Sequence, residues 1–114
     1  MATFTKLKLS GSTDGKGIKV VQTETAGTTI HTAHATALDE IWIYAQNNHT
    51  EDVVLTIEFG GVSSPDDLIV ATVPFKAGLV PIIPGLLLTN SAVVKAFAGT
   101  ANVIILHGFV NRIS

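Results

Sequence analysis

The chain has 114 residues, of which 46% are hydrophobic and only 14% charged, with a net charge of −2 and no cysteine. This length predicts one domain, residues 1–114, with a core that needs no metal or disulfide. The composition excludes a disulfide scaffold and a thiolate metal site. It also argues against nucleic-acid binding, because no cluster of lysine and arginine is present to contact phosphates.

The first expected strands cover residues 3–9, 17–23 and 28–33, where apolar and polar side chains alternate. Residues 1–10 are polar and alternating, without the apolar stretch of a secretion signal. We expect residues 1–10 to form an extended N-terminal arm of the domain that carries Phe4 and Lys6 to an interface.

Three further segments are apolar or aromatic on both faces: residues 41–46, 53–59 and 101–113. This pattern is typical of strands that are covered on both sides. A two-layer sandwich buries only one face of each sheet, so the second faces of these strands need a cover. Another subunit is the simplest cover for so short a chain, and we expect a homo-oligomer, specifically a trimer.

The remaining expected strands cover residues 67–73, 78–83, 85–89 and 92–97. Pro81 and Pro84 each remove a backbone donor, which predicts an edge strand or a bend. The longest apolar stretch, residues 79–88, is short and contains both prolines, so we expect no membrane-spanning segment.

Turn residues separate these strands at short, regular intervals. Gly60-Gly61 predicts a tight turn with positive φ, and Ser64-Pro65-Asp66-Asp67 has the features of a helix start and predicts a single helical turn. Many short strands at this spacing are typical of an all-β fold. We predict an antiparallel two-sheet sandwich, with a jelly roll as the leading topology.

Two histidines, His31 and His34, stand three residues apart near the end of an expected strand. That spacing puts them on opposite faces of a strand. One hypothesis is a metal site formed by His31, His34, Glu40 and His107, but such a site needs three or more converging ligands. The preferred interpretation is that His31 and His34 are polar or interface residues and that the protein holds no metal or other cofactor.

Catalytic motifs are missing from the sequence. It contains no nucleophile elbow, phosphate loop or dinucleotide fingerprint. The carboxylate pairs Asp39-Glu40, Glu51-Asp52 and Asp66-Asp67 fall at strand starts or turns, where solvation, capping or an interface salt bridge is their usual role. We therefore predict that the protein is not an enzyme.

Trp42 and Tyr44 share one face of their strand. A pair of this kind usually belongs to the core or to a subunit interface, and we predict that it anchors a protein interface. A sugar-stacking platform is the alternative.

Several stretches resemble small virion proteins that tailed bacteriophages encode beside their major capsid protein. They are residues 28–45, which include His31, His34, Trp42 and Tyr44, and residues 55–61, 65–69, 83–86 and 108–113. The resemblance implies a head decoration, or cement, protein: a small β-sandwich that binds the major capsid protein as a trimer and stiffens the shell. It also implies a location on the capsid exterior after assembly in the host cytoplasm.

Three other functions remain open from the sequence. The first is a tail or head–tail connector component, which would form rings of six or twelve subunits. The second is a carbohydrate-binding module that uses Trp42 and Tyr44. The third is an enzyme of cupin type, although the histidine pair is one residue too far apart for the cupin metal motif.

Overall fold

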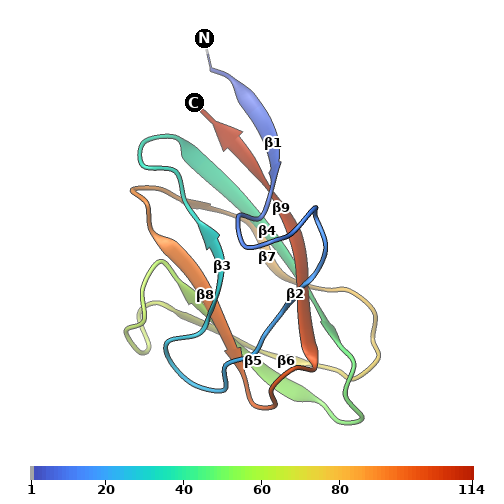
Figure 1. Cartoon of the computed structure of the whole chain (residues 1–114). Coiled ribbons are helices and arrows are strands. Elements are labelled where there is room, and N and C mark those ends of the chain that lie inside the picture. The colour runs from blue at the N-terminus through green and yellow to red at the C-terminus, as the bar shows by residue number, and fades with distance from the viewer. Residues whose placement is uncertain (1) are drawn as a thin grey trace.

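The computed structural model describes residues 2–114, which form nine β-strands in two antiparallel sheets packed as a sandwich (Figure 1). The predicted all-β antiparallel sandwich is confirmed. The strands are β1 (Phe4–Lys8), β2 (Ile18–Lys19), β3 (Thr28–Thr32), β4 (Leu38–Asn47), β5 (Val53–Phe59), β6 (Leu68–Val73), β7 (Val80–Leu88), β8 (Val93–Ala98) and β9 (Ile104–Ile113). No helix in residues 2–114 is long and apolar enough to cross a membrane.

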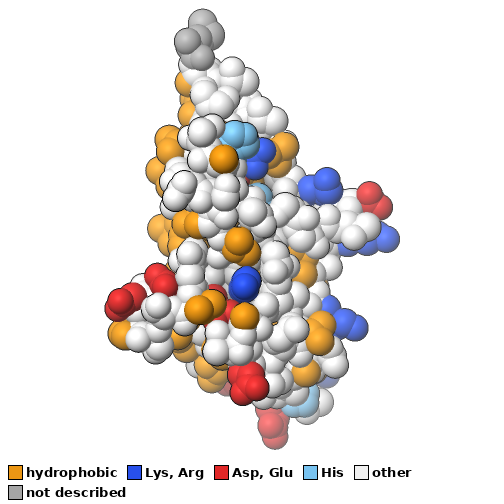
Figure 2. Space-filling view, turned by 60° about the vertical axis from the view of Figure 1, so that its left-hand side comes forward, with side chains coloured by type: hydrophobic (Ala, Val, Ile, Leu, Met, Phe, Trp, Pro, Cys, Tyr) orange, Lys and Arg blue, Asp and Glu red, His pale blue; other side chains and the backbone are white. Residues whose placement is uncertain are grey.

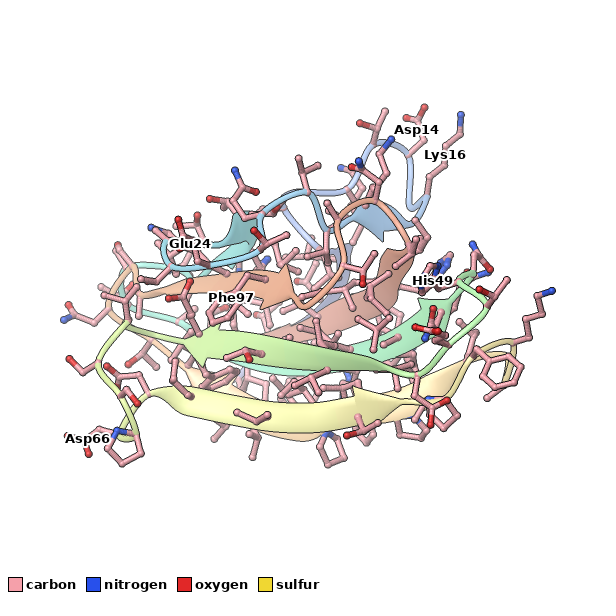
Figure 3. The ribbon with its side chains drawn as sticks, turned by 90° about the horizontal axis from the view of Figure 1, so that it is seen from below. Asp14, Lys16, Glu24, His49, Asp66 and Phe97 are labelled. Carbon is pink, nitrogen blue, oxygen red and sulfur yellow. The ribbon has the colours of Figure 1, made fainter. Side chains whose placement is uncertain are left out.

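The two sheets are built from strands that are distant in sequence. Sheet A has the order β1-β9-β4-β7, with β2 also paired to β9, and sheet B has the order β3-β8-β5-β6. The pairing is nested: β1 pairs with β9, β3 with β8, β4 with β7 and β5 with β6. The chain therefore crosses repeatedly from one sheet to the other, and Figure 3 shows the resulting layers from below.

The core lies between the sheets and is formed by side chains that point inward at alternate positions along the strands. Along β4 the inward positions Ile41, Ile43 and Ala45 are fully buried, while the outward positions between them are half-buried. Leu55 and Ile57 of β5 face them from sheet B and are equally buried. Each fully buried side chain of leucine or isoleucine size stabilises the fold by about 1.5–3 kcal/mol.

The N-terminal segment is not a free arm, which corrects the expectation from the sequence. β1 forms the edge of sheet A and pairs with β9 from Phe4 opposite Ile113 to Lys8 opposite Phe109. Thr3 and Ser114 extend this pairing, since each donates its amide N–H to the other's carbonyl oxygen, at 2.8 and 3.0 Å. Met1 lies outside the described residues.

Some elements of the structure differ in length from those that the sequence predicts. The two strands expected over residues 78–83 and 85–89 are joined in one strand, β7, which forms the other edge of sheet A and pairs with β4 through two register shifts. The expected strand over residues 17–23 is reduced to Ile18–Lys19. By contrast, the single helical turn expected at residues 64–67 is present: Asp67 N–H donates to the Ser63 carbonyl four residues earlier, at 2.9 Å, and β6 begins at the next residue.

The outward side of β5 is covered by the chain itself. Thr56 and Glu58 point away from the core, yet they are only 7% and 1% exposed. The Glu58 carboxylate accepts hydrogen bonds from the Thr25 hydroxyl and the Gly27 amide, both at 2.6 Å. The argument that β5 needs another subunit as a cover is therefore wrong at Glu58, because the β2–β3 connection supplies one.

Candidate functional site

The outward side of sheet A carries four of the six residues that the sequence singled out as interface candidates. Strand β4 directs Glu40, Trp42 and Tyr44 outward, and β9 places Asn111, Phe109 and His107 directly opposite them. Strand β1 adds Phe4 and Lys6 on the same side. We call these eight outward side chains the sheet A face. Phe4, Lys6, Trp42 and Tyr44 are thus brought together, although β1 and β4 are far apart in the sequence.

A row of contacts crosses this face at Trp42. The Lys6 ammonium lies 4.7 Å from the centre of the Phe109 ring, and that ring stacks on Trp42 with centroids 5.9 Å apart and an interplanar angle of 12°. On the other side, Gly85 of β7 has φ +81°, and a Cβ there would lie 2.8 Å from Trp42 Cζ2. Neighbouring strands therefore flank the indole on both sides, which disfavours a sugar-stacking platform.

Apolar side chains at the edges of sheet A extend this surface. Phe4 is 75% exposed, Leu87 of β7 54% and Leu38 of β4 41%. In the register of the sheet, Leu38 is paired with Ile113, and Ile113 with Phe4. The low charge of the chain as a whole is visible on the side of the molecule that Figure 2 presents, where uncharged polar and hydrophobic side chains cover most of the surface.

Glu40 provides a polar centre next to these apolar groups. Its Oε1 atom accepts hydrogen bonds from Trp42 Nε1–H at 2.7 Å and from Asn111 Nδ2–H at 3.0 Å. The hydrogen bond from Asn111 has the larger effect on the pKa of Glu40, followed by the bond from Trp42. Together they outweigh burial, which raises the pKa, so the pKa of Glu40 lies below its ordinary value. The carboxylate is therefore ionised at neutral pH. Beside it lies a hollow of about 370 Å³, lined by Phe4, Thr5, Lys6, Glu40, Asn111 and Ile113.

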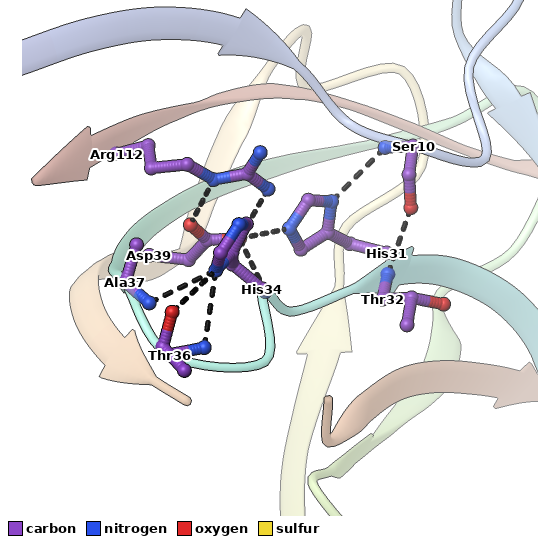
Figure 4. Close-up of polar contacts among 8 residues, drawn as sticks. All are labelled: Ser10, His31, Thr32, His34, Thr36, Ala37, Asp39 and Arg112. Atoms are coloured by element: carbon purple, nitrogen blue, oxygen red, sulfur yellow. Dashed lines mark hydrogen bonds and ion pairs between the residues drawn. The ribbon is translucent and has the colours of Figure 1, made fainter. Parts of the chain in front are cut away.

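His31 has a different environment, between the sheets (Figure 4). Its side chain is 1% exposed, and its Nε2 atom lies 2.8 Å from Asp39 Oδ2. The Ser10 amide N–H donates to His31 Nδ1 at 3.0 Å, so Nδ1 is the acceptor and Nε2–H donates to Asp39. Arg112 completes the cluster by donating from Nε to Asp39 Oδ1 at 2.7 Å and from Nη2 to Oδ2 at 3.0 Å.

The Asp39–His31 pair resembles the acid–base pair of an enzyme, but a substrate could not reach it. The Ser10 group at the imidazole is the backbone amide, while the Ser10 hydroxyl oxygen accepts a hydrogen bond from Thr32 N–H at 2.7 Å. Both ring nitrogens of His31 are engaged inside the fold. The expectation that His31 lies at an interface is therefore wrong, because the side chain is buried and ties β3 to β4.

Asp39 is the charged centre of this buried cluster. Burial by itself raises the pKa of its carboxyl group, but the hydrogen bonds from Arg112 and His31 and the charge of Arg112 outweigh that effect. The pKa of Asp39 is lowered to about 2, so the carboxylate is ionised at neutral pH. In return, the hydrogen bond to Asp39 raises the pKa of Arg112.

The remaining histidine candidates do not form a metal site. His34 is exposed, and its Nδ1 accepts hydrogen bonds from the amides of Thr36 and Ala37, at 3.0 and 2.9 Å, which shapes the β3–β4 connection. His107 lies on the sheet A face, with Nε2 2.8 Å from Gln46 Oε1. Within residues 2–114 no group of three or more histidine, aspartate or glutamate side chains is placed to hold a metal ion.

Two members of the sheet A face were not among the sequence candidates. Phe109 and Asn111 lie in a segment whose alternation predicts a strand, but no local pattern indicates that this strand pairs with β4. Only the register of β9 between β1 and β4 places Phe109 against Trp42 and Asn111 against Glu40.

The comparisons with known proteins gave no relative. A scan against protein-family models, a search of curated proteins and a search of solved structures produced no match. Inferences about function therefore depend on the sequence, the fold and the sheet A face.

Proposed function

We propose that this protein is a non-enzymatic structural protein of a tailed-phage virion, a decoration protein that binds the capsid exterior as a trimer. The observation that carries the proposal is the sheet A face, where the half-buried rings of Trp42, Tyr44 and Phe109 share one side of the sheet with the exposed side chains of Phe4 and Leu87. Larger contiguous apolar patches on soluble proteins usually mark binding sites for other proteins.

The strand order gives further support. We interpret the sandwich as a jelly roll, because β1-β9-β4-β7 and β3-β8-β5-β6 follow the nested order of an eight-stranded, two-sheet jelly roll, with β2 as an addition. Jelly rolls form viral capsid domains but also lectins and cupins, so the fold alone does not select a function. The resemblance of residues 28–45 and of the later stretches to virion proteins is what selects the capsid.

In this proposal, attachment is multivalent. A rigid trimer presents three copies of the sheet A face, and each binds a neighbouring major capsid protein weakly. Once one copy is bound, the others act at a high effective concentration, so modest contacts give a long residence time. Assembly takes place in the host cytoplasm, and the protein then remains on the outside of the virion.

The first test is the mass in solution, measured by light scattering after size exclusion. Three chains of 11.9 kDa give a trimer of about 36 kDa. A stable monomer at all concentrations would contradict the proposal. A hexamer of about 71 kDa would favour the head–tail connector instead.

The second test is attachment to capsids that lack the protein, measured by co-sedimentation. Phe4→Glu places a charge on the sheet A face at a side chain that is 75% exposed, and we expect it to abolish attachment. Val70→Glu is the matched control, since Val70 is 62% exposed on β6 of sheet B. Equal attachment of the two variants would exclude the sheet A face as the capsid contact.

A further inference from the structure

The hollow beside Glu40 contains a carboxylate that is oriented but only partly used. Both hydrogen bonds to Glu40, from Trp42 and from Asn111, end on Oε1. Within residues 2–114 its second oxygen, Oε2, accepts no hydrogen bond and forms no ion pair. An ionised oxygen held in one orientation at the surface is suited to a cationic group with N–H donors.

The nearest cation does not fill this position. Lys6 lines the same hollow, but its ammonium lies over the Phe109 ring and forms no ion pair with Glu40 within residues 2–114. Phe4 and Ile113 provide apolar walls beside the carboxylate, and Thr5 and Asn111 complete the lining.

This combination favours a guanidinium group over an ammonium group. A guanidinium is planar and weakly hydrated, donates two parallel hydrogen bonds to a carboxylate, and stacks on aromatic rings. The hollow provides both partners, the Glu40 carboxylate and the exposed Phe4 ring. An ammonium group bonds the same carboxylate but gains little from the ring and is more costly to desolvate.

A second copy of this chain does not supply that group. The sequence contains one arginine, Arg112. Its Nε and Nη2 atoms already donate to the buried Asp39, at 2.7 and 3.0 Å. Because Asp39 holds the Nε–Nη2 edge of the guanidinium and the side chain is only 27% exposed, Arg112 is poorly placed to extend into the hollow of a second copy.

We propose that the hollow formed by Phe4, Glu40, Asn111 and Ile113 is a binding site for an arginine side chain of a different protein. The inference depends on the proposed function only in naming the capsid protein as the source of that arginine. The site itself is a property of the isolated chain and is tested without a capsid.

The experiment is a titration of the protein with Nα-acetyl-arginine amide, followed through the indole N–H resonance of Trp42. The chain contains a single tryptophan, and its indole donates to Glu40, so this signal reports on the carboxylate. We expect a saturable shift, and binding of Nα-acetyl-lysine amide that is at least about three-fold weaker. An equal response to both amides would overturn the preference for arginine.

Variants separate this site from nonspecific binding. Glu40→Gln keeps a carbonyl oxygen for Trp42 and Asn111 but removes the charge, and we expect it to abolish the shift. Glu24→Gln is the matched control, since Glu24 is exposed on the β2–β3 connection (Figure 3) and should leave the titration unchanged. A shift that survives in Glu40→Gln would overturn the proposal.

Lys6 distinguishes a site for a cation from a site for an anion. If the hollow binds a cation, Lys6→Met removes a competing charge and should tighten arginine binding roughly two- to five-fold at low salt. Weaker binding in Lys6→Met would contradict a cation site. Capsid attachment that is undiminished in Glu40→Gln would refute the capsid protein as the source of the arginine and leave the decoration role standing. A monomeric protein that still binds arginine at Glu40 would refute the decoration role and leave the arginine site standing.

Discussion

Each sheet carries a glutamate on the outward side of an inner strand, and the chain treats the two in opposite ways. Glu58 of β5 in sheet B is 1% exposed, and the β2–β3 connection covers it. Both of its carboxylate oxygens accept a hydrogen bond, from Thr25 and from Gly27. Glu40 of β4 in sheet A is half-buried, uses one oxygen and borders a hollow.

This difference between Glu58 and Glu40 shows which outward face the chain covers with its own residues. Where the chain covers a polar group, it also supplies the hydrogen-bond partners, and within residues 2–114 no buried side-chain nitrogen or oxygen is left without one. The sheet A face keeps a carboxylate oxygen of Glu40 without a hydrogen bond and the exposed ring of Phe4. Substitutions on the covered side should therefore affect stability, and those on the open face should affect binding.

The largest loss of stability is expected at Asp39, the inward neighbour of Glu40 on β4. Asp39→Ala leaves Arg112 without its partner in the buried cluster and removes the acceptor of His31. Breaking a buried pair in this way costs about 3–5 kcal/mol. Urea unfolding measures the change, with the exposed Asp66→Ala as a control that should stay within about 0.5 kcal/mol of the parent protein. Equal effects would refute the inward–outward distinction along β4.

The next effect is a loss of stability in acid. The pKa of Asp39 is about 2 in the folded protein, below its value of about 3.9 in an unfolded chain. Its contribution to stability is therefore complete above about pH 4 and is lost as the pH falls toward 2, by about 2–3 kcal/mol. Urea midpoints between pH 5 and pH 2, roughly the range of this titration, measure the slope. In Asp39→Asn the slope should be smaller, and an unchanged slope would mean that other carboxyl groups cause it.

A smaller loss is expected at Glu58. Glu58→Ala leaves the Gly27 amide and the Thr25 hydroxyl without their acceptor under the β2–β3 connection, which we expect to cost about 2 kcal/mol. Glu24→Ala, on the exposed part of the same connection, should be neutral. Hydrogen exchange at Gly27 should become faster in Glu58→Ala alone, and unchanged exchange would show that Glu58 does not fix this connection.

Strand positions were largely predictable because alternation and turn residues act locally. The strand expected at residues 53–59 is β5, Val53–Phe59, and the expected turn at Gly60 has φ +85°. The segment with Pro81 and Pro84 is an edge strand, as expected from its missing donors. Joining its two halves into β7 required the pairing with β4, which a local pattern does not reveal.

The candidate site was predictable only in part. Alternation placed Trp42 and Tyr44 on one face, but their union with Phe4, Lys6 and Asn111 depends on strand pairing across the sequence. Asn111 donates to Glu40 over a separation of 71 residues, and Arg112 to Asp39 over 73. Burial of His31 depends on its bond to Asp39, and Asp39 in turn depends on Arg112, 73 residues away. Because the sequence does not show that Arg112 lies beside Asp39, the buried position of His31 was not predicted.

The smallest effect on stability is expected for Glu40→Gln, which tests directly whether Glu40 and Glu58 differ in their contribution to stability. The glutamine carbonyl still accepts from Trp42 and Asn111, and the position is open to water, so a lost charge leaves no buried donor unpaired. We expect no measurable change in the urea midpoint, together with the loss of arginine binding. Glu58→Gln, measured in parallel, should lower the midpoint, because the two short bonds to this 1% exposed side chain are charge-assisted and a neutral amide would make weaker ones. If Glu40→Gln lowered the midpoint as much as Glu58→Gln, the sheet A face would be part of the stabilising structure rather than a surface kept for a partner.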